Sequence, residues 1–161
     1  MKNLKYSIIL LSIFVIGCTD SNSDAYDSGQ IASEVEAVFK AYVDHVNTAG
    51  LASVDTFFID DERFYWVEDG IIQYPDKASL ISGLKEFIPQ VTSIEMEIMS
   101  TKTHVISDEH ASFFVRFKEE IALNSGYSFT LDGAITILFE KQGSTWKFLN
   151  GHSSVIKPRS N

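Results

Sequence analysis

The stretch GSTWKFLNGHSS, residues 143–154, decides how the end of this chain folds. Its aromatic and β-branched residues follow a Gln142-Gly143 turn signal, so we expect a β-strand over residues 145–156 that forms a hairpin with the preceding strand. With Gln142-Gly143 as the loop, apolar side chains meet across the first part of the hairpin. The predicted opposing pairs are Phe139 with Trp146, Ile137 with Phe148, Ile135 with Asn150, and Gly133 with His152.

Three more strands are predicted before this one, over residues 92–106, 110–123 and 127–141, because the chain there is rich in β-branched and aromatic residues between turn signals. If Ser125-Gly126 is a two-residue turn, Arg116 lies opposite Ile135 and Phe114 opposite Ile137, on the sheet face that His152 shares. A one-residue change in that loop would reverse the face, because side chains alternate along a strand.

The first half of the chain has helical periodicity instead. Apolar residues recur at steps of three and four and predict a helix that ends at Gly50; they are Ile31, Val35, Val38, Tyr42, Val46 and Ala49. The elements expected next are a short helix or turn over 51–58, a hairpin of 63–67 and 71–74 around Asp69-Gly70, and a helix from the N-cap Asp76 to Pro89. Helices first and antiparallel strands afterwards predict an α+β fold with the helices on one face of the sheet.

This order of elements, closed by WKFLNGHSS at residues 146–154, resembles the SnoaL-like domains of the nuclear transport factor 2-like superfamily over roughly residues 30–156. The resemblance implies a cone-shaped, curved antiparallel sheet packed on about three N-terminal helices, with an interior pocket. Isomerases, cyclases, dehydratases and hydrolases share this fold with domains that only bind ligands or partners, so the chemistry stays open. Many members carry a first histidine where this chain has Asn150, which weakens a mechanism with paired imidazoles.

The N-terminus has the features of an export signal. Lys2 and Lys5 precede an apolar run from Ile8 to Ile16 that is too short to span a bilayer, which predicts a signal peptide over residues 1–17. The end of the run, with Cys18 as the single cysteine of the chain, resembles the bacterial lipoprotein signal. That resemblance implies lipidation of Cys18 and anchoring to the cell envelope, at the outer rather than the inner membrane if both exist, since Thr19 follows.

The two resemblances, together with the acidic composition of the tether, set the expected boundaries. Residues 18–29 hold the lipidated cysteine and a flexible acidic tether, residues 30–157 the SnoaL-like domain, and residues 158–161 a tail. The 161 residues suit one domain, and the formal charge of −9 argues against nucleic acid as a partner. No metal-binding spacing or phosphate-binding glycine loop occurs, so neither a metal nor a cofactor is expected.

His152 is the candidate for acid–base catalysis, because an imidazole with an ordinary pKa of about 6.5 exchanges protons at neutral pH. Gly133 opposite it would leave room for a ligand. The alternative is a histidine that only completes the last strand through hydrogen bonds. Arg116 either binds a carboxylate or another oxygen-rich group in the pocket, or pairs with an acidic neighbour on the sheet surface.

The expected pocket has mostly apolar walls and a polar floor. Its predicted walls are Tyr42, Trp66, Phe114, Ile135 and Phe148, and its predicted floor is Arg116, Asn150 and His152. Glu119-Glu120 is interpreted as solvated surface. An apolar patch on the sheet face away from the helices would mark an oligomer interface, so we expect a homodimer there; the patch consists of Val115, Phe117 and Leu149.

Three functions are consistent with these observations. The first is a lipid-anchored envelope protein that binds a small, partly apolar ligand in a conical pocket. The second is an isomerase, dehydratase or hydrolase that uses His152 as its acid–base group. The third is an interaction domain whose cavity is filled by its own side chains.

Overall fold

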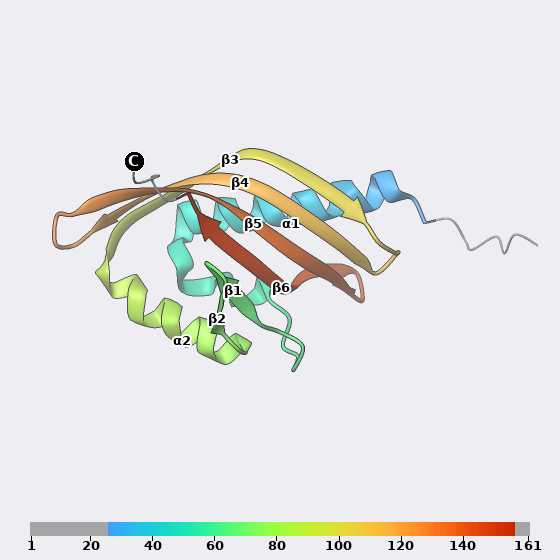
Figure 1. Ribbon diagram of the computed structural model, residues 1–161, viewed down its shortest axis with the longest axis horizontal. Coiled ribbons are helices and arrows are strands. Elements are labelled where there is room, and N and C mark those ends of the chain that lie inside the picture. The colour runs from blue at the N-terminus through green and yellow to red at the C-terminus, as the bar shows by residue number, and fades with distance from the viewer. Residues whose placement is uncertain (1–25, 157–161) are drawn as a thin grey trace, which may run out of the picture.

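A six-stranded sheet curves over two α-helices in the computed structural model of this protein (Figure 1). The structure describes residues 26–156, except for the side chains of residues 52 and 53. The predicted signal peptide, Cys18 and the tail over 158–161 lie outside the described residues. The helical elements are α1 (Ser28–Ala49), the 3-10 helix η1 (Gly50–Phe57), α2 (Lys77–Phe87) and the 3-10 helix η2 (Ile88–Gln90). The strands are β1 (Trp66–Glu68), β2 (Ile71–Tyr74), β3 (Val91–Val105), β4 (His110–Leu123), β5 (Ser128–Gln142) and β6 (Thr145–Val155).

The α+β class and the sequence of helices and strands are confirmed. Among the described residues, no helix is both long and apolar enough to cross a membrane. The sheet order is β2-β1-β6-β5-β4-β3, and every neighbouring pair is antiparallel except β1 and β6, which run parallel. The sheet is therefore mixed rather than purely antiparallel, because β1 joins the free edge of β6 in the parallel direction.

Helix α1 packs along the inner face of the sheet. Its first turn is capped by Asp27, whose side chain accepts a hydrogen bond of 2.9 Å from the backbone N–H of Gln30. The fully buried row is Ile31, Val35, Phe39, Val43 and Val46. Val38 and Tyr42, predicted on this row, lie on the adjacent one and are half-buried. The fully buried row faces the sheet: the ring centroid of Phe39 lies 5.0 Å from that of Phe113 on β4.

Helix α2 begins as its sequence predicts. The Asp76 side chain accepts a hydrogen bond from the backbone N–H of Ser79 at 2.7 Å, and the Ser79 hydroxyl lies 3.3 Å from the Asp76 N–H. This reciprocal capping pair satisfies two backbone donors at the helix start. The α-helix ends at Phe87, and the chain continues as η2, in which Ile88 keeps helical angles of φ −47° and ψ −46°. Pro89 has no N–H and so cannot donate the hydrogen bond that would extend α2.

The turn between β4 and β5 is one residue longer than predicted. Leu123 donates a backbone hydrogen bond of 2.8 Å to Tyr127, which leaves residues 124–126 in the loop, and Gly126 has φ 83°. A three-residue hairpin loop commonly ends with a residue in this left-handed region. Arg116 therefore pairs with Ala134 instead of Ile135. The predicted register is wrong, and the two faces of β4 are exchanged.

A bulge in β6 changes the last hairpin as well. Phe139 pairs with Phe148, and Leu138 pairs with Asn150, so Leu149 is an extra residue in β6. A bulge reverses the inward and outward positions beyond it. Before the bulge, Gln142 pairs with Thr145, so the turn is at residues 143–144 rather than Gln142-Gly143, and Trp146 pairs with Lys141. The predicted partners of Trp146 and Phe148 are wrong because of this turn, and those of Asn150 and His152 are wrong because of the turn and the bulge together. His152 pairs with Thr136 on one side and Val67 on the other.

These two irregularities overturn the predicted dimer surface. Val115, Phe117 and Leu149 have exposed fractions of 0%, 4% and 5%, and they belong to the core between sheet and helices. Side chains buried inside one chain cannot contact a second copy, so this apolar interface does not exist as predicted.

Aromatic side chains fill one end of the space under the sheet. This aromatic cluster consists of Phe39, Phe57, Phe58, Phe113, Phe139 and Phe148. The Phe139 and Phe148 rings lie 4.9 Å apart at a steep angle, a favourable edge-to-face arrangement. A polar contact holds α1 to the same end, where Trp146 Nε1 donates to Glu34 at 2.9 Å and Lys141 Nζ pairs with it at 3.0 Å.

Candidate functional site

The opposite end of the same space is hollow. A cavity of about 430 Å³ lies between the inner face of the sheet, α2 and the β1–β2 hairpin; we call it the inner pocket. Aromatic and aliphatic side chains form most of its wall, among them Tyr42, Leu51, Phe58, Trp66, Tyr74, Leu80, Leu84, Phe87, Ile94, Phe117, Ile121, Phe129 and Leu131. Its polar lining consists of Glu68, Asp69, Glu119, Ser153 and Ser154 with the tyrosine hydroxyls. This size and lining suit a small, mostly apolar ligand.

Glu119 is the inward-facing carboxyl of this pocket. It stands on β4 between Phe117 and Ile121, which point to the same face because side chains alternate along a strand. Its carboxyl makes no hydrogen bond or ion pair with another described residue. Burial in apolar surroundings disfavours the charged form and raises the pKa of Glu119 to about 7. At neutral pH this group exists in both protonation states.

Tyr42 contributes a hydroxyl from α1. Its ring packs against those of Phe57 and Phe148, with centroids 5.4 and 5.3 Å away. Its hydroxyl has no hydrogen-bond partner among the described residues. Burial, and after it the charge of Glu119, raises the pKa of Tyr42 well above its usual range. Tyr42 therefore stays protonated and presents one O–H donor to the pocket.

The rim of the pocket is acidic. Glu68 and Asp69 lie at the β1–β2 turn, where Asp69 and Gly70 both have positive φ, 49° and 90°. Asp69 Oδ1 accepts a hydrogen bond of 3.3 Å from the backbone N–H of Val155, which holds the turn against β6. Partial burial, and then the charge of Asp69, raises the pKa of Glu68. Among residues 26–156 no group of three His, Cys, Asp or Glu could hold a metal ion.

Of the eight predicted pocket residues, the structure brings Tyr42 and Trp66 to the inner pocket. Trp66 is 8% exposed, and its Nε1 donates to the Ser153 hydroxyl at 3.2 Å. Ile135 and Phe148 also face inward, but they are buried in the core beside the pocket, with exposed fractions of 8% and 1%.

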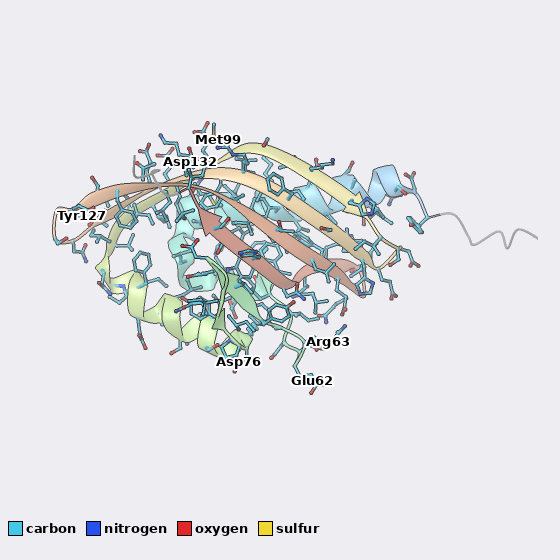
Figure 2. All side chains as sticks on the ribbon, viewed as in Figure 1. Glu62, Arg63, Asp76, Met99, Tyr127 and Asp132 are labelled. Carbon is cyan, nitrogen blue, oxygen red and sulfur yellow. The ribbon has the colours of Figure 1, made fainter. Side chains whose placement is uncertain are left out.

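The four other predicted residues lie away from the pocket. Phe114, Arg116, Asn150 and His152 are on the outer face of the sheet, because of the longer loop and the bulge described above. Arg116 forms an ion pair of 2.9 Å with Asp132, which Figure 2 shows on the side of the sheet away from α2. His152 is exposed. The predicted pocket floor is therefore wrong, and so is the position assigned to His152 as a catalytic group.

The space expected over Gly133 is occupied. A Cβ at Gly133 would lie 3.0 Å from two atoms of the Phe117 ring and 2.5 Å from the carbonyl oxygen of Ser154. A ligand cannot enter there without displacing Phe117. The glycine accommodates core packing rather than a ligand.

Sequence reasoning missed Glu119 by treating Glu119-Glu120 as one solvated pair. The strand pattern carried the signal, because Phe117, Glu119 and Ile121 occupy alternate positions and must share a face. Glu120 does point outward, where its carboxylate pairs with Lys118 at 2.6 Å. The missed rim residues, Glu68 and Asp69, had no comparable signal, because they become part of a wall only when the hairpin docks beside β6.

Comparison with known proteins identifies the family and the fold of this chain. The SnoaL-like domain family matches residues 35–158, most of the chain. The chain belongs to this family. No curated protein matches the chain by sequence. The SnoaL-like fold is shared with isomerases, dehydratases and ligand-binding proteins, so membership identifies the scaffold and leaves the reaction open.

Solved structures resemble this SnoaL-like domain in fold. A nuclear transport factor 2-like superfamily protein from Salmonella enterica serovar Typhimurium matches with a TM-score of 0.71 at 9% identity, covering 83% of this chain and 96% of that one. A protein from Novosphingobium aromaticivorans named for scytalone dehydratase gives 0.68 at 11%, covering 78% and 83%. A type 2 hexachlorocyclohexane dehydrochlorinase gives 0.66 at 12%, covering 80% and 86%.

Proposed function

We propose that this SnoaL-like domain binds a small, mostly apolar molecule in the inner pocket, with Glu119 and Tyr42 as its polar contacts. The supporting observation is a cavity of about 430 Å³ whose wall is largely apolar and into which these two polar groups project. A ligand oxygen or nitrogen would give the Tyr42 hydroxyl and the Glu119 carboxyl the hydrogen bonds that the described residues do not provide.

A neutral fluorescent probe tests this binding directly. 2-(Naphthalen-1-yl)ethanol combines an apolar ring with one hydroxyl, and we expect the full-length chain to bind it saturably. A double variant with Leu84→Trp on α2 and Leu131→Trp on β5 narrows the pocket from two walls and should abolish binding. Phe114→Trp adds an indole on the outer face and should bind as the wild type does. Equal binding to the narrowed variant, or no binding to any form, would exclude the pocket as a ligand site.

A second candidate function is acid–base catalysis by Glu119. A carboxyl whose pKa lies near 7 can take a proton from a carbon acid and return it at neutral pH. The Tyr42 hydroxyl could donate a hydrogen bond to the oxygen on which negative charge develops. In this role Glu119 replaces His152, which the sequence had suggested.

Proton exchange can be measured without knowing the natural substrate. The neutral ketone 2-tetralone carries acidic C–H groups beside its carbonyl, and NMR in D₂O follows their exchange. We expect the wild type to accelerate exchange, and Glu119→Gln to slow it by on the order of 10²-fold or more. Glu120→Gln removes the same charge outside the pocket and serves as the control. Identical rates in wild type and Glu119→Gln would rule out this catalytic role.

We also propose that the chain is exported and anchored to the cell envelope through a lipid on Cys18. The support is sequence alone: two lysines, a short apolar run that ends at Ile16, and the single cysteine two residues later. Metabolic labelling of the host with an alkyne fatty acid should mark the wild type and leave Cys18→Ser unmarked. Equal labelling of both would refute the anchor.

A further inference from the structure

Every charged side chain of residues 26–156 that lines the inner pocket is acidic. These side chains are Glu68, Asp69 and Glu119, and no Lys, Arg or His of the described residues joins them. The basic residues that flank Glu119 along β4 point outward, where Lys118 pairs with Glu120 and Arg116 with Asp132. Within the described residues, the carboxyls of Glu68 and Glu119 form no ion pair. An anionic ligand would therefore meet only like charge in this pocket.

Aromatic side chains line the same pocket as these carboxyls. They include Tyr42, Trp66, Tyr74, Phe117 and Phe129. An aromatic face attracts a cation through the negative charge of its π-system, more strongly where water is displaced. The pocket thus combines two features that stabilise positive charge, and its apolar wall still suits a hydrocarbon body.

On the basis of the binding function proposed above, we propose that the inner pocket selects a protonated amine carried on an apolar body, with the ammonium group against Glu119 and Tyr42. An ammonium donates hydrogen bonds to both the carboxylate and the tyrosine oxygen. Glu119 is the favoured contact because it lines the pocket and is desolvated without a partner among the described residues, and a cation beside it stabilises its ionised form. At the rim, Glu68 and Asp69 add a field that attracts cations and repels anions.

Three probes with one ring system separate charge from shape. 2-(Naphthalen-1-yl)ethylamine, 2-(naphthalen-1-yl)ethanol and 3-(naphthalen-1-yl)propanoate share the naphthalene ring and differ mainly in the charge of the end group. We expect the full-length chain, at about pH 8, to bind the amine about tenfold more tightly than the alcohol, and the carboxylate most weakly. The Leu84→Trp/Leu131→Trp variant corrects for binding outside the pocket.

Two variants of matched charge then locate the effect. Glu119→Gln should bring the affinity for the amine to within about twofold of that for the alcohol, because it removes the carboxylate contact. Glu120→Gln removes the same charge on the outer face and should leave the amine preference intact. If both variants weaken amine binding equally, the preference reflects net charge alone and the proposal is overturned.

The outcomes also distinguish failure of the amine inference from failure of the proposed ligand binding on which it rests. Saturable binding of the alcohol without any preference for the amine preserves the apolar ligand site and overturns the amine inference. Tighter binding of the carboxylate than of the amine would likewise overturn the amine inference and preserve the ligand site. If none of the three probes binds, the ligand function and the amine inference both fail.

Discussion

The two ends of the space under the sheet differ in how their polar groups are satisfied. At the aromatic cluster the rings pack at centroid distances of 4.9 to 6.2 Å, and the nearby carboxylate of Glu34 binds Trp146 and Lys141. Hydrogen bonding from Trp146, with further help from Gln30 and Lys141, lowers the pKa of Glu34 to about 2. At the inner pocket, burial raises the pKa of Glu119 to about 7. The first end stabilises the charge of its carboxylate through hydrogen bonds within the protein, whereas the carboxyl of Glu119 has no such partner among the described residues.

Helix α1 and strand β4 each run through both ends of this space. In each element the earlier residues belong to the aromatic cluster and the later residues line the inner pocket. Tyr42 lies at the boundary, with its ring against Phe57 and Phe148 and its hydroxyl in the pocket wall. The packed aromatic rings next to the cavity therefore fix the position of Tyr42 in its wall.

Truncating a side chain of the aromatic cluster should have the largest effect on the free energy of unfolding. Phe148 is 1% exposed and contacts rings on all sides, so Phe148→Ala should lower the free energy of unfolding by about 3–5 kcal/mol. Leu131→Ala at the half-buried pocket wall should cost about 1 kcal/mol, because its side chain already borders empty space. Urea unfolding of both variants measures the difference, and similar losses would contradict the contrast between a packed end and a hollow end.

Neutralising the pocket carboxyl should stabilise the protein. The folded-state pKa of Glu119 is raised from 4.5 to about 7, so between these values the folded state holds a proton that the unfolded state has released. Stability from this group is therefore complete below about pH 4.5 and is lost as the pH rises to about 7. Glu119→Gln removes that loss.

We accordingly expect Glu119→Gln to raise the free energy of unfolding by about 1–2 kcal/mol at pH 8 and to change it little at pH 4. Urea unfolding at the two pH values provides the measurement. Glu120→Gln, on the outer face, should stay within about 0.5 kcal/mol of the wild type at both. A less stable Glu119→Gln variant at pH 8 would mean that the carboxylate has a stabilising partner after all.

We expect the smallest effect from substitution of His152, the acid–base candidate in the sequence analysis. Because His152 is exposed on the outer face, His152→Ala should change the free energy of unfolding by less than about 0.5 kcal/mol. It should also leave binding of 2-(naphthalen-1-yl)ethanol unchanged. Loss of binding in His152→Ala would place the ligand on the outer face and refute the assignment of the inner pocket.

Local sequence signals predicted the elements well. The Asp76 cap, the stop before Pro89 and the four long strands follow from backbone chemistry and side-chain period, which act within a few residues. The resemblance carried by residues 146–154 led to the right family and fold. The candidate site was predicted only at Tyr42 and Trp66, because both lie on elements whose inward face did not depend on the uncertain loop.

The amino-acid sequence by itself determined that helices come first and that four long strands follow. It did not determine which face of each strand is inward. That choice rests on one residue in the loop over 124–126 and one bulge at Leu149, and each exchanges the faces because side chains alternate along a strand. Only the tertiary structure places Glu119 in a desolvated pocket and His152 on the exposed face. The burial of each residue depends on which face of the sheet α1, α2 and the β1–β2 hairpin cover.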